Sequence, residues 1–121
     1  MKSLSKYVVS QTETIKHAVS VIQGNRSRCV IVINANNRVV GVVSEGDVLR
    51  FILQGIDLHT PLNRVITPSF KYLTTEDMRR AYELVNKFGI TLIPIVDEDF
   101  RLKDIISIFD VMKYCKYANA S

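Results

Sequence analysis

The sequence has only two cysteines and no long apolar run, and each shortage excludes a class of protein. Its apolar runs fall well short of the roughly 20 residues that cross a bilayer, and no signal-like apolar stretch follows the first six residues. Cys29 and Cys115 lack the spacing of metal or redox motifs, so we interpret them as buried free thiols. This pattern predicts a cytoplasmic protein with no membrane segment.

Catalytic and metal-binding patterns are also missing. The sequence shows no Ser-His-Asp order, P-loop or cluster of His and Cys at ligand spacing, so we expect no enzyme and no metal site. His17 and His59 are interpreted as surface residues. The 121 residues carry a net charge of +4, but the Lys and Arg residues are scattered and form no basic stripe. Nucleic acid is therefore the least favoured partner, and only steeply salt-dependent binding would support it.

What the sequence does have is an internal repeat. A shift of 63 residues aligns residues 38–47 with residues 101–110, and each stretch is an apolar run that ends in Ser-x-x-Asp. The chemical class matches along most of the length without a gap, which predicts a tandem duplication with repeats at residues 1–60 and 61–121. The paired polar residues are Ser44 and Asp47 in the first repeat, and Ser107 and Asp110 in the second.

Each repeat is predicted to run strand, helix, strand, strand, helix. Thr14 is typical of a helix N-cap, and the β-branched run at residues 29–33 suits a strand buried on both faces. The second repeat follows the same order, with an extended piece at residues 69–73 and a central strand at residues 92–96. Pro94 has no N–H to donate, so we expect this strand to lie at an edge or to be bulged.

The predicted fold is of the mixed α/β (α+β) class. A half with three strands exposes an apolar sheet face that it cannot cover alone. Two βαββα repeats packed about an approximate two-fold axis would cover each other. That packing would place both Ser-x-x-Asp turns in one cleft between the halves.

This arrangement resembles a tandem pair of cystathionine-β-synthase (CBS) domains, often called a Bateman module. Residues 41–47 and 105–110 carry the resemblance, residues 65–68 and 89–97 support it, and it extends over residues 5–117. The first turn is similar to those of CBS pairs attached to sugar nucleotidyltransferases and sugar-phosphate isomerases. The resemblance implies a regulatory module that binds an adenosine compound such as AMP, ADP, ATP or S-adenosylmethionine.

The resemblance also implies which residues bind the ligand. Asp47 and Asp110 would hold ribose hydroxyls, while Ser44 and Ser107 would assist at the ribose or the phosphate. The adenine would lie in an apolar slot between the first short strand and the start of a central strand. The corresponding positions are Tyr7, Val8, Val9, Arg28 and Cys29 in the first repeat, and Ile66, Thr67, Phe70, Thr91 and Leu92 in the second.

The Ser-x-x-Asp turn has two interpretations. A carboxylate can accept hydrogen bonds from both hydroxyls of a ribose, and the free N–H groups of a helix N-terminus suit a phosphate. The same pattern is a capping box, in which the acid bonds back to its own backbone and is less free for a ribose. Two copies at one cleft, together with the family resemblance, favour binding.

The two repeats differ where a ligand would lie. Phe109 stands at the place of Gly46 and fills space, and Asp104 stands where a glycine is expected before the last strand of the second repeat. We therefore expect one working site, centred on Asp47, or two unequal sites.

Three basic residues near the turns leave alternatives open. Arg28 either meets a phosphate or is solvated, and its counterpart Thr91 is neutral. Arg50 and Lys113 follow each Asp at matching places, and a solvated helix face is the favoured interpretation for both.

The helices after Ser44 and Ser107 carry more apolar residues than one small core needs, which predicts a two-fold homodimer through these helices. The alternative to a nucleotide sensor is a ligand-free structural dimerisation module of a larger enzyme or transcriptional regulator. Either module could act on an enzyme domain in cis or in trans.

Overall fold

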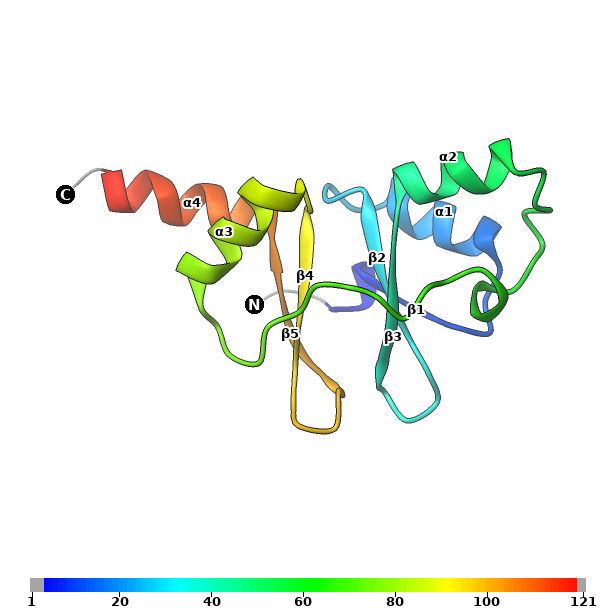
Figure 1. The fold of residues 1–121 in the computed structure, drawn as a ribbon, viewed down its shortest axis with the longest axis horizontal. Helices are drawn as coiled ribbons and strands as arrows, with labels where there is room; N and C mark the ends of the chain where they lie inside the picture. The colour runs from blue at the N-terminus through cyan, green and yellow to red at the C-terminus, as the bar shows by residue number, and fades with distance from the viewer. Residues whose placement is uncertain (1–3, 120–121) are drawn as a thin grey trace.

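The computed structural model describes residues 4–119, which form two halves set side by side (Figure 1). The first half contains β1 (Val8–Ser10), α1 (Ile15–Gln23), β2 (Cys29–Ile33), β3 (Val39–Ser44) and α2 (Glu45–Leu53). The second half contains α3 (Met78–Phe88), β4 (Leu92–Val96), β5 (Leu102–Ser107) and α4 (Ile108–Asn119). Single 3-10 turns lie at Leu4–Lys6 and Leu62–Arg64. The mixed α/β class is therefore confirmed.

In the first half, the predicted elements form where the sequence places them. Thr14 caps α1 by accepting a hydrogen bond from the backbone N–H of His17 at 3.1 Å. The central strand β2 pairs in parallel with β1 and antiparallel with β3, and residues 29–32 are buried. Helices α1 and α2 pack their apolar faces on this three-stranded sheet. The continuous apolar run of β2 is thus explained by burial on both faces.

The sheet of the second half contains only β4 and β5. The prediction that this repeat begins with a regular strand is therefore wrong. Only an isolated bridge between Leu73 and Ile95 remains. In the first half, Ile31 N–H donates to the carbonyl of Tyr7 at 2.7 Å. The residue equivalent to Ile31 is Pro94, which has no N–H and so cannot donate the equivalent bond. The entering segment is held further along, where the Pro94 carbonyl accepts from the Leu73 N–H at 3.0 Å.

With two strands in this sheet, β4 is an edge strand, as expected for a strand that contains Pro94. The register shift after Ile95 has a counterpart after Val32 in the first half, so it belongs to the repeat and does not depend on the proline.

An approximate two-fold relation is visible in the hydrogen bonds that join the halves. Val39 N–H donates to the carbonyl of Phe100 at 2.8 Å, and Leu102 N–H donates to the carbonyl of Asn37 at 3.0 Å. A shift of 63 residues exchanges these two bonds. An antiparallel bridge between the two hairpin turns lies beside them. The halves are therefore related as the duplicated sequence predicts.

Each half has its own apolar core, and a third core lies between them. The buried members of this third core are Cys29, Ile31, Val39, Leu92, Val96 and Ile105. Each sheet thus covers an apolar face of the other, which removes from water the surface that a single half would leave exposed.

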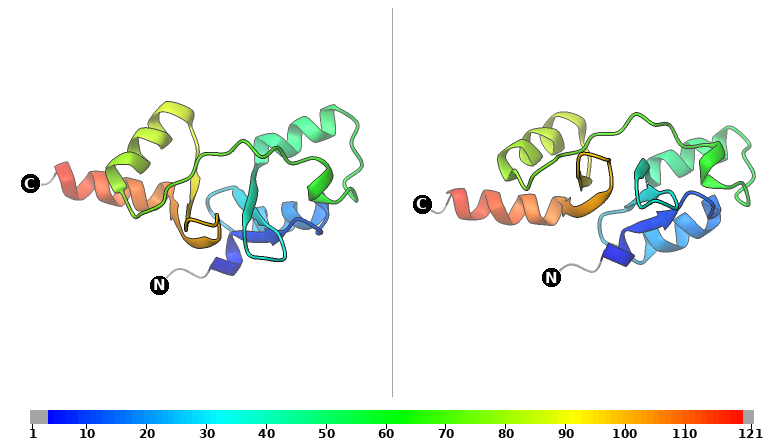
Figure 2. Two further views of the ribbon diagram at one scale, coloured as in Figure 1. Left: turned by 60° about the horizontal axis from the view of Figure 1, so that its bottom comes forward. Right: turned by 90° about the horizontal axis from the view of Figure 1, so that it is seen from below.

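The connector between α2 and α3 runs across the seam from one half to the other (Figures 1 and 2). Its first part packs on the first half, where Leu62 is fully buried and Val65 and Ile66 lie against the same core. Ile66 approaches Gly41 so closely that a Cβ there would lie 3.3 Å from the Ile66 Cβ. None of the helices in the described chain is both long and apolar enough to span a bilayer.

Candidate functional site

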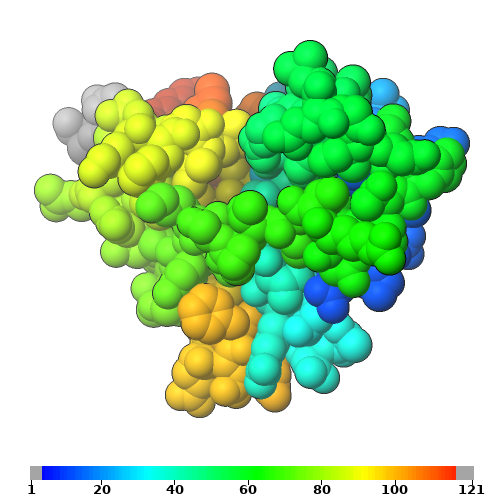
Figure 3. Space-filling view, turned by 45° about the vertical axis from the view of Figure 1, so that its right-hand side comes forward, coloured from blue at the N-terminus to red at the C-terminus, as the bar shows by residue number. Residues whose placement is uncertain are grey.

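A cleft of about 510 Å³ opens at the seam, where the N-terminus of α2 faces the C-terminal end of α3 (Figure 3). Both halves line it. The first half contributes the ends of β2 and β3 and the first turn of α2, and the second contributes residues 69–71 and 88–92. Seven of the residues expected from sequence line this cleft, namely Ser44, Asp47, Arg28, Cys29, Phe70, Thr91 and Leu92.

The other expected residues lie elsewhere. The lining does not include Val8, Val9, Ile66 or Thr67. Val9 is buried in the first core, and Ile66 packs on Gly41. Ser107 and Asp110 also lie outside this cleft, at the start of α4.

The lining residues that sequence reasoning missed include Lys71, Phe88 and Ile90. The two-fold packing of the repeats contains the information that would have found Phe88 and Ile90. The cleft at one Ser-x-x-Asp turn is closed by the other repeat, so the residues before the central strand of that repeat belong to it. Lys71 follows Phe70, which the sequence did place in an adenine slot.

Asp47 forms the complete capping box of α2. Its Oδ2 accepts hydrogen bonds from the backbone N–H of Ser44 at 2.8 Å and from the Ser44 hydroxyl at 3.0 Å. The Ser44 Oγ in turn accepts from the backbone N–H of Asp47 at 3.1 Å. The other oxygen, Oδ1, pairs with Nη2 of Arg50 at 2.9 Å. A carboxylate offers about four acceptor positions, so one position remains on Oδ1.

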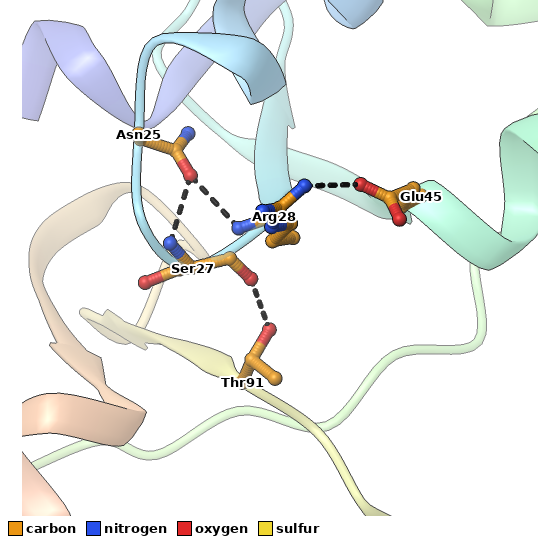
Figure 4. Close-up of polar contacts among 5 residues, drawn as sticks. All are labelled: Asn25, Ser27, Arg28, Glu45 and Thr91. Carbon is orange, nitrogen blue, oxygen red and sulfur yellow. Dashed lines mark hydrogen bonds and ion pairs between the residues drawn. The ribbon is translucent and has the colours of Figure 1, made fainter.

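Arg28 stands at the edge of the cleft in a left-handed conformation, with φ of 56°. The carboxamide oxygen of Asn25 holds this turn by accepting from the backbone N–H groups of Ser27 and Arg28 at 3.1 and 3.0 Å (Figure 4). The guanidinium pairs with Glu45 at 3.2 Å, and both side chains are exposed. Across the seam, the Thr91 hydroxyl donates to the carbonyl of Ser27 at 2.5 Å. The cleft wall thus links the two halves directly.

The inner wall of the cleft is apolar. Val42, Phe70 and Leu92 contribute hydrocarbon surface, and Cys29 is buried beside them. Burial raises the pKa of the Cys29 thiol to about 12, and the nearby Asp47 carboxylate adds to this shift. The thiol is therefore neutral at physiological pH and behaves as part of the apolar wall, not as a nucleophile.

The corresponding turn in the second half has the same cap but different surroundings. Ser107 and Asp110 repeat the capping box, with the Ser107 N–H donating to Asp110 Oδ2 at 2.8 Å. Ser107 is only 5% exposed. The Arg26 guanidinium lies 4.2 Å from the centre of the Phe109 ring. A hollow of about 550 Å³ borders this cation–ring pair, but neither Ser107 nor Asp110 lines it.

Within residues 4–119, no three His, Cys, Asp or Glu side chains gather as metal ligands would.

The fold and the cleft together define a class of protein. It is a duplicated α/β module whose two halves share a ligand-sized cleft at their seam.

The particular family follows from comparison with known proteins. Residues 4–54 and 63–117 each match the CBS domain model, so the chain belongs to the CBS domain family and carries a pair of these domains. It is 30% identical to arabinose 5-phosphate isomerase GutQ of Escherichia coli over 103 residues, which are 84% of this chain and 32% of GutQ. The chain spans between 24% and 65% of the length of the first curated relatives that it matches.

Solved structures share the fold. A CBS domain protein from Pyrobaculum aerophilum complexed with AMP superimposes with a TM-score of 0.71 and 24% identity, covering 91% of this chain and 89% of that one. CBSX2 in complex with AMP superimposes with a TM-score of 0.75 and 21% identity, covering 93% of this chain and 89% of that one. The pair of CBS repeats expected from the sequence is thereby confirmed.

Proposed function

We propose that this chain is a regulatory module that binds an adenosine nucleotide in the cleft at the start of α2. The observation that carries the proposal is the position of Asp47, whose carboxylate lies at a seam cleft with apolar walls from both halves. Relatives of the same fold that were solved with AMP support it. AMP, ADP and ATP are the first candidates, and S-adenosylmethionine is a further one.

The lining suggests a role for each part of the ligand. The base packs against Cys29, Phe70 and Leu92, and burial of its faces supplies most of the affinity. A ribose hydroxyl donates to the remaining acceptor position of Asp47 Oδ1, beside Arg50. Ser44, Arg28 and Thr91 complete the proposed site. Ser107 and Asp110 serve as a helix cap, and we assign Val8, Val9, Ile66 and Thr67 to the packing around the cleft.

Regulation is expected because both halves line the cleft. A ligand that touches both α2 and residues 88–92 binds more tightly to one relative placement of the halves than to others. Its binding therefore shifts the population toward that placement, and a fused or associated enzyme domain would sense the shift. In this proposal the repeats at residues 1–60 and 61–121 move as the two partners, and the module itself performs no catalysis.

Two matched cap variants test the proposal. Asp47→Ala and Asp110→Ala each remove an equivalent capping box, so both lower the melting temperature by a similar amount, about 4 °C for roughly 1 kcal/mol. AMP, ADP, ATP, S-adenosylmethionine and NADH are then added in a thermal-shift panel. We expect an adenosine nucleotide to stabilise the wild type and Asp110→Ala but not Asp47→Ala. If no compound in the panel raises the melting temperature of the wild type, the proposal is wrong.

A second candidate function is structural dimerisation without a ligand, and exposed apolar side chains favour it. On α2, Leu49, Ile52 and Leu53 are 58%, 51% and 88% exposed, and on α4 Met112 and Tyr114 are exposed as well. Apolar residues gathered on such faces mark association surfaces. A homodimer through α2 and α4 is compatible with nucleotide binding, so the two functions can coexist. Light scattering that gives a monomer at high protein concentration would contradict the dimer.

We also propose a cytoplasmic location. Both cysteines are free thiols, with Cys29 buried and Cys115 partly exposed, which suits a reducing compartment. Cell fractionation of the natural protein tests this, and recovery from an oxidising compartment would contradict it.

A further inference from the structure

The cleft does not end at the seam, because a second hollow adjoins it along the outer face of α3. This hollow measures about 410 Å³ and is bordered by Arg80, Glu83 and Lys87. Lys71 and Phe88 line both hollows. The Phe88 ring therefore stands between a largely apolar cleft and a basic surface, and an extended ligand could occupy both.

The basic side chains along this path differ in whether they are already ion-paired. In the cleft Arg28 is already paired with Glu45, and in the second hollow Arg80 is paired with Glu83 at 3.1 Å. Lys71 and Lys87 are different, since neither lies within ion-pair distance of a carboxylate in the part of the chain that the structure describes.

Both free ammonium groups gather at one aromatic ring. The Nζ of Lys71 lies 4.3 Å and the Nζ of Lys87 lies 5.4 Å from the centre of the Phe88 ring. The ring offsets part of their mutual repulsion through its negative face. An anion beside either ammonium group would offset more, because an opposite charge within a few ångström stabilises the charged form.

We infer that the phosphates of the bound nucleotide leave the cleft across Phe88, so that the preferred ligand is an adenosine di- or triphosphate and not the monophosphate. This inference rests on the proposed function. Beside the first turn of α2, Glu45 and Asp47 already hold the guanidinium groups of Arg28 and Arg50, so these two cations are engaged before a phosphate arrives. The exit across Phe88 leads to Lys71 first and to Lys87 beyond it. Each added phosphate therefore gains a further cationic partner.

Titration calorimetry with AMP, ADP and ATP at one fixed ionic strength tests the inference. The variant is Lys87→Gln, which changes the second hollow and leaves the lining of the cleft intact. The matched control is Lys16→Gln, an exposed lysine on α1 whose loss changes the net charge equally. Arg28→Gln tests the alternative, in which Arg28 beside α2 holds the phosphates.

We expect the wild type to bind ATP more tightly than AMP. Lys87→Gln should weaken ATP by about three- to fivefold, the range of an exposed charge pair, and leave AMP unchanged. Lys16→Gln should alter neither, and Arg28→Gln should leave the ratio of ATP to AMP affinity unchanged.

Two outcomes overturn the inference while sparing the proposed function. One is a wild type that binds AMP as tightly as ATP, and the other is an ATP preference that Arg28→Gln removes and Lys87→Gln does not. Absence of binding by all three nucleotides overturns the proposed function itself, and the inference falls with it.

Discussion

The two Ser-x-x-Asp turns have the same internal geometry and different surroundings. In both, the serine N–H donates to the aspartate Oδ2 at 2.8 Å and the serine hydroxyl completes the capping box. Beside the first turn, Gly46 leaves the cleft open, and a Cβ placed there would meet only the Ser44 Oγ at 3.7 Å. Beside the second, the Phe109 ring carries the Arg26 guanidinium.

This difference separates two roles that one sequence pattern combines. The pattern specifies a helix cap in both repeats, because the cap needs only residues within one turn. A binding site needs, in addition, room beside the cap and a suitable wall from the other half. The chain meets both needs at Asp47. At Asp110 the cap remains, and the place that corresponds to Gly46 holds an aromatic side chain.

A second difference concerns the strand that enters each sheet. Ile31 holds the entering segment through a hydrogen bond to the Tyr7 carbonyl, whereas Pro94 cannot make that bond. The segment before α3 is therefore free of regular pairing as far as Leu73, and it supplies Phe70 and Lys71 to the cleft. The segment that forms no regular strand in the second half thus supplies part of the cleft wall.

Making the first half like the second at this point should have the largest effect. In Ile31→Pro the Tyr7 carbonyl loses its donor, and the ring removes hydrocarbon contacts in a fully buried central strand. We expect a loss of about 2–4 kcal/mol in the free energy of unfolding. Urea denaturation measures it, with Ile31→Val as the control for lost side-chain volume. A loss no greater than that of Ile31→Val would show that the hydrogen bond does not hold β1.

Placing the second half's aromatic residue in the first should strongly weaken nucleotide binding at the proposed site. Gly46→Phe puts a ring where the cleft is open, and the cleft cannot hold both the ring and a base. We expect nucleotide affinity to fall by ~100-fold, about 2.7 kcal/mol. Helix α2 should form at least as well, since glycine is a poor helix former.

Gly46→Ala is the control for this variant, because its added methyl group meets ordinary contacts only. Calorimetry measures the affinity and circular dichroism the melting temperature. Unchanged nucleotide affinity in Gly46→Phe would mean that the ligand lies elsewhere.

The sequence predicted those features that depend on residues close together in the chain or on the repeat itself. The cap at Thr14, the buried run of β2 and the two-fold seam all follow from local chemistry and the 63-residue register. The edge position of the strand that contains Pro94 was also predicted, because the missing N–H is a property of that one residue.

Features set by packing between the halves were not predictable in the same way. Phe109 was expected to fill space, but its contact with Arg26 joins residues far apart in the sequence. Phe88 and Lys71 line the cleft because α3 ends opposite α2, which depends on how the two sheets meet. Val8 and Thr67 were assigned to a ligand slot by position in the repeat, and the structure leaves them outside the lining.

The smallest effects are expected at the two hairpin turns, where equivalent residues share an unusual backbone. Asn37 and Phe100 have φ values of 62° and 65°, in the left-handed region. Asparagine tolerates this conformation, whereas a residue such as phenylalanine pays about 1–2 kcal/mol for it. Phe100 recovers part of this cost, because its ring packs against Tyr72 edge to face with centroids 4.9 Å apart.

Exchanging the two residues separates backbone strain from ring packing. In Phe100→Asn the relief of strain and the loss of an aromatic contact worth about 0.5–1.5 kcal/mol nearly cancel, so stability changes by less than ~0.5 kcal/mol. In Asn37→Phe the strain is added, and the Asn37 carboxamide contact to the Leu102 carbonyl at 3.5 Å is lost. That variant should lose about 1–2 kcal/mol. Equal losses in the two variants, measured by urea denaturation, would show that Phe100 is held by its ring contact alone and that its backbone carries no strain to relieve.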